Sequence, residues 1–187
     1  HFNTLKVLNL ATANRSTQLL TYMLDTIYQE ILSQRMDKPV ILIVDDEVEV
    51  LQTMRDNIST SFRNLFDIET AQDAEEGLDV IQDLLEEKKQ IAVIISDYNL
   101  MKQGKEQGDD FLIQAHKLVP NAKKILITGA ALHHDIDQAL VKTTRYANLY
   151  RYLKKPWDVN DLALTIEEAC KSFLSHLVIQ NQNQDRF

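Results

Sequence analysis

The 187-residue sequence has little of what secreted scaffolds and membrane proteins need: it contains one cysteine, four glycines and three prolines. A single cysteine, Cys170, cannot close an internal disulfide, so a disulfide-stabilised scaffold is excluded. The sequence also has no run of 18 apolar residues and no signal-peptide pattern. We therefore expect a soluble, cytoplasmic protein.

Positive charge is also scarce. The chain has 20 Lys and Arg residues against 28 Asp and Glu residues, which gives a formal net charge of -8. Such a chain is poorly suited to bind nucleic-acid phosphates or an anionic membrane as its main activity, and we expect neither as a direct partner. The 44% hydrophobic content is enough for the core of one ordinary domain, with residues left over for extensions.

The middle of the chain alternates between two kinds of pattern. Short apolar runs predict strands at 40–44, 66–70, 91–96, 123–128 and 149–154. Between and after them, apolar residues at helical spacing predict helices at about 47–60, 73–87, 109–118, 131–144 and 159–180. Strands that alternate with helices indicate an α/β fold with an open five-stranded parallel sheet and helices on both faces.

Helical extensions flank this central region. Residues 1–37 form a predicted N-terminal extension with a heptad-like seam, Leu10, Ala13, Thr17, Leu20, Leu24, Ile27 and Ile31. This seam fits a coiled-coil dimer and a helix folded back on its own domain about equally well. The central domain is predicted at 38–172, and the last helix continues into a C-terminal extension or tail at 173–187. A homodimer through the two extensions is therefore one assembly compatible with the sequence.

Charged and hydroxyl side chains stand where the predicted strands end. The stretch "ILIVDDE" runs from an apolar strand into Asp45, Asp46 and Glu47, and the third, fourth and fifth strands lead to Asp97, Thr128 and Lys155. One Asp after a strand is usually a cap or turn residue, but parallel strands bring their carboxyl ends to one edge, where ligands bind. Carboxylates there suit Mg²⁺, and a lysine with a hydroxyl suits phosphoryl oxygens.

Four segments that follow one another along the chain together resemble the receiver domain of two-component response regulators: "VDDE", "SDYNL", "ITGA" and "YLKKPW". By that resemblance Asp97 is the phosphoacceptor, and Asp45 and Asp46 bind Mg²⁺ with Asp97. The backbone carbonyl of Asn99 is a further metal ligand. The resemblance also gives Thr128 and Lys155 the role of binding the phosphoryl oxygens, and it makes Tyr152 the aromatic side chain that changes rotamer on activation.

The resemblance implies a flavodoxin-like fold with strand order 2-1-3-4-5. It implies a signalling domain rather than a dedicated enzyme, with Mg²⁺ as cofactor and a histidine kinase or histidine phosphotransfer protein as partner. The expected function is phosphoryl transfer from a phosphohistidine to Asp97, which switches a partner-binding or dimerisation surface.

Two other functions fit parts of this pattern. A Mg²⁺-dependent phosphohydrolase of the haloacid-dehalogenase type can also use an aspartate nucleophile on an α/β sheet. That family has a second Asp two residues after the nucleophile, which acts as the general acid. Here that position is Asn99, whose side chain cannot act as a carboxylic acid. A receiver-like scaffold that works without phosphorylation is the third interpretation, against which the presence of Asp97, Thr128 and Lys155 speaks.

The loop after Asp97 departs from the family pattern. Met101 stands where the family usually has Pro, and the expected glycine, Gly108, comes eleven residues after Asp97 rather than about eight. The segment "MKQGKEQGDD" is therefore expected to hold a three-residue insertion beside the site.

Overall fold

The computed structural model of the chain describes residues 29, 37–62, 65–100, 107–129 and 133–184. The apolar seam of the predicted N-terminal helix falls outside the described residues, as does most of the loop segment in which the insertion is predicted.

The centre of the fold is one parallel sheet with strand order β2-β1-β3-β4-β5. Its strands are β1 (Val40–Val44), β2 (Asp67–Ala71), β3 (Ile91–Asp97), β4 (Lys123–Thr128) and β5 (Leu149–Lys154). The order 2-1-3-4-5 and the flavodoxin-like class are the predicted ones and are confirmed.

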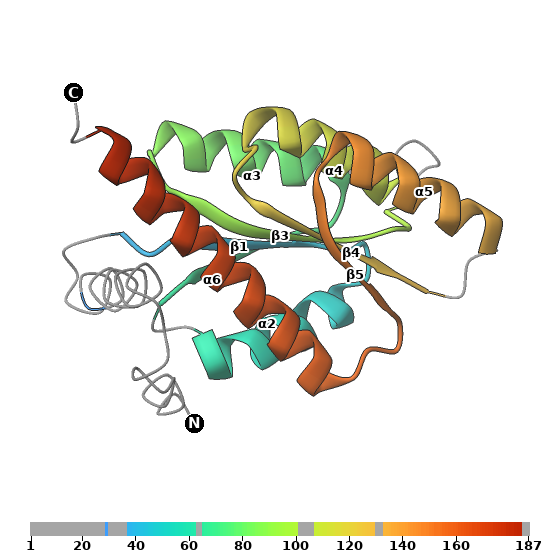
Figure 1. Cartoon of the computed structure of the whole chain (residues 1–187). Helices are drawn as coiled ribbons and strands as arrows, with labels where there is room; N and C mark the ends of the chain where they lie inside the picture. Colours follow the sequence, from blue (N-terminus) through green and yellow to red (C-terminus); the bar gives the residue numbers. More distant parts are fainter. Residues whose placement is uncertain (1–28, 30–36, 63–64, 101–106, 130–132, 185–187) are drawn as a thin grey trace, which may run out of the picture.

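Helices cover both faces of the sheet (Figure 1). One face carries α3 (Ala74–Glu86), α4 (Gly108–Leu118) and α5 (His133–Tyr146), and the other carries α2 (Val48–Phe62) and the long α6 (Val159–Gln184). The helices between strands return the chain from the carboxyl edge of the sheet to its amino edge, which is the connection that parallel strands require.

Burial explains why the central strands are almost continuously aliphatic. Every residue of β1 and of β3 is buried, because both faces of these strands lie under helices. Alternate side chains enter two cores, with Ile41 and Ile43 facing α2 and α6 and Leu42 and Val44 facing the other three helices. Edge strand β5 is partly exposed throughout.

Several predicted boundaries were wrong by one to four residues. Strand β2 begins and ends one residue later than predicted, and β3 extends to Asp97, because that residue still pairs with Ile127 of β4. Helix α5 ends two residues later than predicted, and α6 extends four residues further. Helix α6 is continuous across position 172, and Phe173 and Leu174 are buried in the same core as Ile166.

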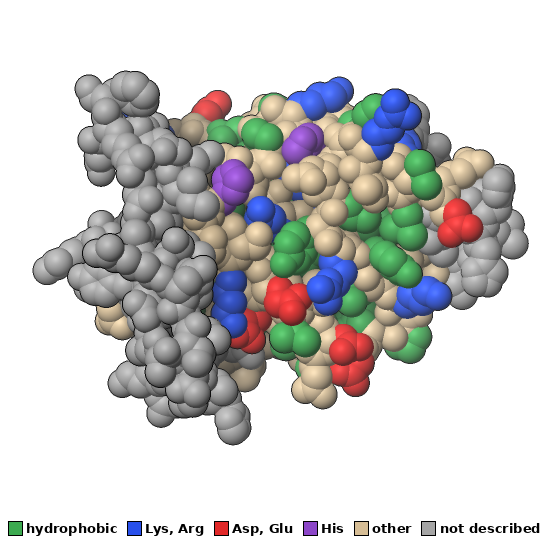
Figure 2. Space-filling view, viewed as in Figure 1, with side chains coloured by type: hydrophobic (Ala, Val, Ile, Leu, Met, Phe, Trp, Pro, Cys, Tyr) green, Lys and Arg blue, Asp and Glu red, His purple; other side chains and the backbone are tan. Residues whose placement is uncertain are grey.

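The face shown in Figure 2 carries charges of both signs, interspersed with apolar side chains. Large apolar residues exposed on the described part of the chain include Tyr152 in β5 and Val159 and Leu164 in α6. None of the described helices has the length and hydropathy that a membrane span requires.

Candidate functional site

Strand register brings the predicted site residues to one edge of the sheet. Val44, the last residue of β1, pairs with Ser96 of β3, so the residues that follow them in the chain, Asp45 and Asp97, stand beside each other. Asp97 pairs with Ile127 of β4, which places Thr128 one residue further along the same edge. The backbone N–H of Lys155 donates to the carbonyl of Thr128 at 2.7 Å, which ties the end of β5 into this row.

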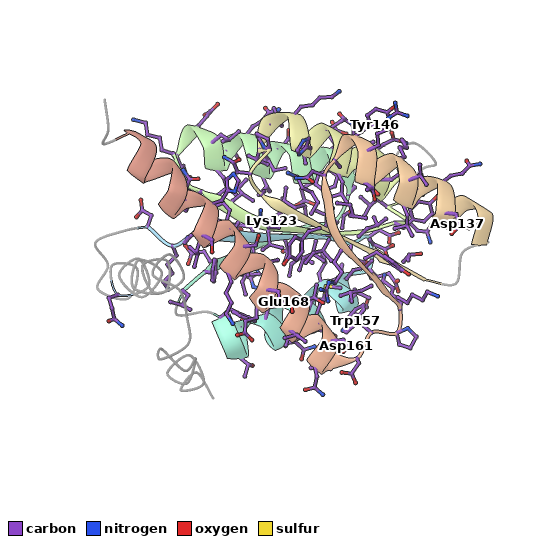
Figure 3. The ribbon with its side chains drawn as sticks, viewed as in Figure 1. Lys123, Asp137, Tyr146, Trp157, Asp161 and Glu168 are labelled. Atoms are coloured by element: carbon purple, nitrogen blue, oxygen red, sulfur yellow. The ribbon has the colours of Figure 1, made fainter. Side chains whose placement is uncertain are left out.

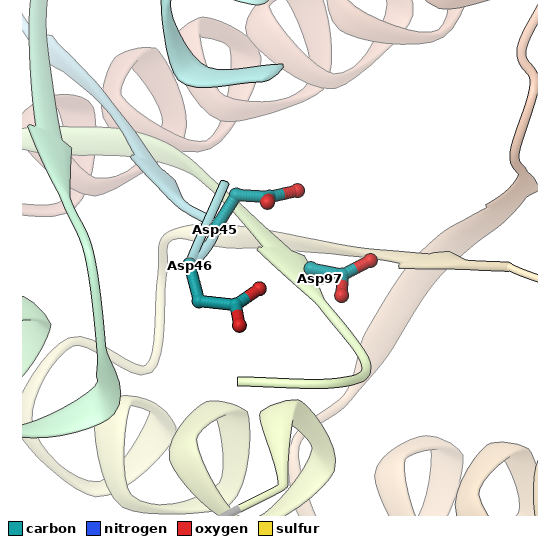
Figure 4. Close-up of side chains that lie close together, drawn as sticks. All are labelled: Asp45, Asp46 and Asp97. Carbon is teal, nitrogen blue, oxygen red and sulfur yellow. The ribbon is translucent and has the colours of Figure 1, made fainter. Parts of the chain in front are cut away.

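Three carboxylates meet at this edge (Figure 4). One carboxylate oxygen from each of Asp45, Asp46 and Asp97 lies within 4.8 Å of the others. Asp45 and Asp97 are buried, with only 1% and 4% of their surface exposed, whereas Asp46 is partly exposed. The cluster therefore has a buried floor and one side open to solvent.

Lys155 supplies positive charge to the cluster. Its Nζ lies 2.8 Å from Oδ2 of Asp45, to which it donates a hydrogen bond, and 2.9 Å from Oδ1 of Asp97 in an ion pair. The third carboxylate near the ammonium is that of Glu47, at 3.6 Å. A single lysine thus bridges the ends of β1 and β3 from the end of β5.

Backbone amides orient the two buried carboxylates. Oδ1 of Asp45 accepts the N–H of Glu47 at 2.9 Å, and Oδ2 of Asp97 accepts the N–H of Asn99 at 2.9 Å. These are turn interactions made by an aspartate with the residue two positions later, and they fix the side-chain rotamers. Oδ1 of Asp97 faces only the Lys155 ammonium among the described residues, and each carboxylate oxygen has two lone pairs, so one lone pair remains for another ligand.

The charges of the site are not balanced. Burial raises the pKa of Asp45 and of Asp97 above the ordinary value of an aspartate, and the ammonium of Lys155 opposes this rise without cancelling it. Burial alone would lower the pKa of Lys155, but the facing carboxylates of Asp45 and Asp97 raise it overall. Lys155 is therefore protonated at neutral pH, and an additional cation would relieve the remaining negative charge.

The donor set fits a divalent cation with a preference for oxygen. The three clustered side chains are all carboxylates, one oxygen of each lies within 4.8 Å of the others, and the partly exposed Asp46 leaves the site accessible. Hard cations such as Mg²⁺ prefer such ligands and retain some of their waters. The predicted contact from the carbonyl of Asn99 stays a prediction, since only the amide of that residue is seen bonded to the site.

Two predicted residues lie beside the carboxylates rather than among them. The Thr128 side chain is fully buried, and its hydroxyl donates to the carbonyl of Gly129 at 3.1 Å. Tyr152 pairs with Leu126 through the backbone of β5 and is 44% exposed. The hydroxyl of Thr128 is therefore bonded to the neighbouring backbone rather than to the carboxylates, and the Tyr152 ring faces outward.

The sequence singles out Gly108 as the glycine expected after Asp97, but it does not predict how closely this residue contacts the site. A Cβ built on Gly108, the first residue of α4, would lie 1.8 Å from the carbonyl oxygen of Asp97 and 2.8 Å from Oγ of Ser96. The amide of Gly108 donates to the carbonyl of Tyr98 at 2.8 Å. The start of α4 therefore packs directly on the backbone that carries Asp97, despite the insertion predicted in the preceding loop.

Comparison with known proteins agrees with this geometry. The family model described as the response regulator receiver domain matches residues 41–167. The hydrogenase transcriptional regulatory protein HoxA of Bradyrhizobium diazoefficiens is 29% identical over 133 residues, which are 71% of this chain and 24% of that protein. The chain thus spans about a quarter of the length of this curated relative.

Two solved structures show the same similarity. The signal receiver domain of an HD domain-containing protein from Pseudomonas fluorescens Pf-5 is 28% identical, with a TM-score of 0.60 over 74% of this chain and 98% of that one. A CheY-like receiver domain from Methanospirillum hungatei JF-1 is also 28% identical, with a TM-score of 0.60 over 73% and 97% of the two chains. With the matched family model, the sheet order and the acidic cluster, these findings show that the chain belongs to the response regulator receiver domain family of two-component systems.

Proposed function

We propose that this chain is a phosphorylation-controlled switch in which Asp97 accepts a phosphoryl group from a phosphohistidine on a histidine kinase or a histidine phosphotransfer protein. The observation that carries the proposal is the ammonium of Lys155, which lies 2.9 Å from Asp97 and 2.8 Å from Asp45 at the edge of a three-carboxylate cluster. Such a donor would place the chain in the cytoplasm.

Asp97 is the nucleophile of the proposed transfer. One of its carboxylate oxygens attacks phosphorus, the phosphorus–nitrogen bond breaks, and the electron pair stays on the imidazole nitrogen. The other ring nitrogen carries a proton taken from solvent, so the ring leaves as neutral histidine. The Asp97 carboxylate and the phosphoryl group are both anionic and repel each other, and the ammonium of Lys155 lowers this repulsion. The Asn99 amide holds the Asp97 carboxylate in position. Asp45, Asp46, Asp97 and the Asn99 carbonyl would hold Mg²⁺, which neutralises phosphoryl oxygens when bound.

Thr128 and Tyr152 are the proposed switch. A phosphoryl group on Asp97 adds strong hydrogen-bond acceptors to the edge of the sheet, and they compete with the Gly129 carbonyl for the Thr128 hydroxyl. Movement of Thr128 toward the phosphoryl group frees space beside β5, into which the outward Tyr152 ring can turn. Chemistry at the strand ends would thereby change the surface formed by α5, β5 and α6.

A stoichiometry experiment separates this proposal from a phosphohydrolase. The purified chain is incubated with Mg²⁺ and a small acyl phosphate, and bound and released phosphate are measured together with turnover of an unactivated phosphate monoester. We expect at most one phosphoryl group per chain, slow release and no turnover of the monoester. Sustained turnover of the monoester would contradict the proposal in favour of a hydrolase.

A homodimer through the helical extensions is a second part of the proposal. It is based on the apolar seam in residues 1–37 and on α6, which continues to Gln184. We expect phosphorylation to change the dimer equilibrium. Light scattering with and without a phosphoryl mimic measures the molar mass, and an unchanged value would contradict this part alone.

A further inference from the structure

An ion triad joins α5 to the first turn of α4. Nζ of Lys142, in α5, lies 2.8 Å from Oδ2 of Asp109 and 2.7 Å from Oδ1 of Asp110. Asp109 is the second residue of α4 and follows Gly108 directly. The triad is therefore one residue away from the contact between Gly108 and the backbone of Asp97.

Asp109 depends on Lys142 for its charge balance. The side chain of Asp109 is 8% exposed, and its other oxygen, Oδ1, is buried with no hydrogen-bond partner in the described part of the chain. Removing one member of such a pair leaves a buried charge uncompensated, which costs far more than the intact pair contributes. Asp110, in contrast, is about half exposed and can be hydrated without Lys142.

A carboxylate at Asp109 that loses its counter-ion regains hydration when the first turn of α4 moves outward. Gly108 would move with it, which would loosen the hydrogen bond from its N–H to the Tyr98 carbonyl and its close packing on the Asp97 carbonyl. The same backbone carries the amide of Asn99 that orients the Asp97 carboxylate. A shift at Asp109 therefore changes the position of the phosphoacceptor.

We propose that Lys142 is a positioning residue for phosphoryl transfer: by holding Asp109, it keeps the start of α4 on the backbone of Asp97 and the Asp97 carboxylate in its reactive orientation. The inference rests on the proposed role of Asp97 as phosphoacceptor. The ion pairs of Lys142 within the described residues go to α4 and not to the carboxylate cluster, so it acts through Asp109 and Gly108.

Lys142 is also accessible from solvent. Its side chain is 38% exposed and lines an open hollow along α5 together with Asp137 and Tyr146. Figure 3 labels these two neighbours on the helix. Substitution there removes the ammonium without opening a cavity in the core, so the variant is suited to a functional test.

The test compares Lys142→Met, Lys142→Arg, Asp109→Asn and the double variant Lys142→Met/Asp109→Asn. The matched control is Lys171→Met, which breaks an exposed Lys–Glu pair within α6 that includes no residue of the site. The first readout is the initial rate of Asp97 phosphorylation by an acyl phosphate at saturating Mg²⁺, well below the thermal midpoint. The second is hydrogen exchange of the Gly108 amide without any phosphoryl donor.

We expect Lys142→Met to phosphorylate about tenfold more slowly, because small misplacements of a reacting group have effects of this size or larger. Lys142→Arg restores the rate, and the double variant recovers most of it, since the amide that replaces the Asp109 carboxylate carries no buried charge that needs a counter-ion. Gly108 exchange becomes about tenfold faster in Lys142→Met alone, as expected for easier local opening. The control Lys171→Met changes neither readout.

A purely structural role would give a different result. A Lys142→Met variant with a lower thermal midpoint but the wild-type rate and wild-type Gly108 exchange would overturn the inference. If the wild-type chain is not phosphorylated at all, the proposed function fails. The Gly108 exchange rates then still decide whether Lys142 holds the start of α4.

Discussion

The ammonium of Lys155 lies 2.9 Å from Oδ1 of Asp97, and the two residues come from the ends of β5 and β3, which are separated by β4 in the sheet. The lysine side chain spans this distance and also reaches Asp45 on β1. It therefore compensates two buried carboxylates that would otherwise face each other without a cation.

Replacing Lys155 should show how strongly the buried carboxylates of Asp45 and Asp97 depend on its positive charge. We predict that Lys155→Met lowers the free energy of unfolding by about 2–4 kcal/mol without Mg²⁺, because Asp45 and Asp97 lose their buried counter-ion. Added Mg²⁺ recovers part of the loss. Urea unfolding measures both effects, with Lys171→Met as the exposed control, for which we expect a change of no more than about 0.5 kcal/mol. Equal losses in the two variants would contradict this prediction.

The raised pKa of Asp97 predicts a specific pH dependence. A carboxyl whose pKa is higher in the folded than in the unfolded state loses its proton first in the unfolded chain, so stability falls as pH rises between the two pKa values. Without divalent cations, wild-type stability should therefore decline relative to Asp97→Asn as pH rises from about 4 through the folded pKa. Urea unfolding across this pH range measures the difference in unfolding free energy between the wild type and Asp97→Asn. A difference that does not change with pH would contradict the raised pKa of Asp97.

Lys124 should make the stability of the fold change with pH in the opposite direction, and at higher pH. Its side chain is fully buried in β4, where Nζ donates to the carbonyls of Val119 and Pro120 at 2.8 and 3.2 Å and lies 3.0 Å from Nδ1 of His116. Burial lowers the pKa of Lys124 to about 7, and the nearby charge of Lys123 acts in the same direction. The folded chain then releases this proton before the unfolded chain does.

Stability should rise with pH where the unfolded state still holds the proton. We predict that the unfolding free energy of the wild type increases relative to that of Lys124→Met above pH 7, by up to about 1.4 kcal/mol per pH unit. Below that pH the two curves run parallel. A difference that stays flat from about pH 7 to about pH 9 would show that the three acceptors keep Lys124 charged.

Gly108 and Gly77 form a matched pair of helix glycines. A Cβ on Gly108 would meet the Asp97 carbonyl oxygen at 1.8 Å, whereas on Gly77 the nearest atom is a ring carbon of Phe111 at 2.9 Å. We predict that Gly108→Ala costs about 3 kcal/mol or more because backbone must move, and that Gly77→Ala costs about 1 kcal/mol or less because helix propensity offsets its clash. Urea unfolding of both variants provides the comparison, and equal costs would contradict the close approach.

Much of the fold followed from local patterns in the sequence. Buried strands carry aliphatic runs, VILIV in β1 and ILI within KKILIT in β4, so both strands were predicted at their observed bounds. The end of β3 was missed by one residue, because Asp97 is polar and yet still pairs with Ile127. The end of α6 was missed by four, since no Gly or Pro marks where that helix ends.

The site was predictable only as a set of strand ends. Strand order brings Asp45, Asp97 and Thr128 to one edge, but the reach of Lys155 across β4 depends on side-chain geometry that no pattern encodes. The contact of Lys142 with Asp109 joins residues on different helices, and the packing of Gly108 on Asp97 joins residues at the two ends of a loop. Such non-local contacts leave no periodic signal in the sequence.

The central claim is that Asp97 accepts a phosphoryl group with the help of Mg²⁺. The most direct measurement is the intact mass of the chain after incubation with a small acyl phosphate, with and without Mg²⁺, for the wild type and for Asp97→Asn. We predict one phosphoryl adduct on the wild type with Mg²⁺, little or none without it, and none on Asp97→Asn. An adduct that persists in Asp97→Asn, or no adduct on the wild type under any condition, would contradict the account.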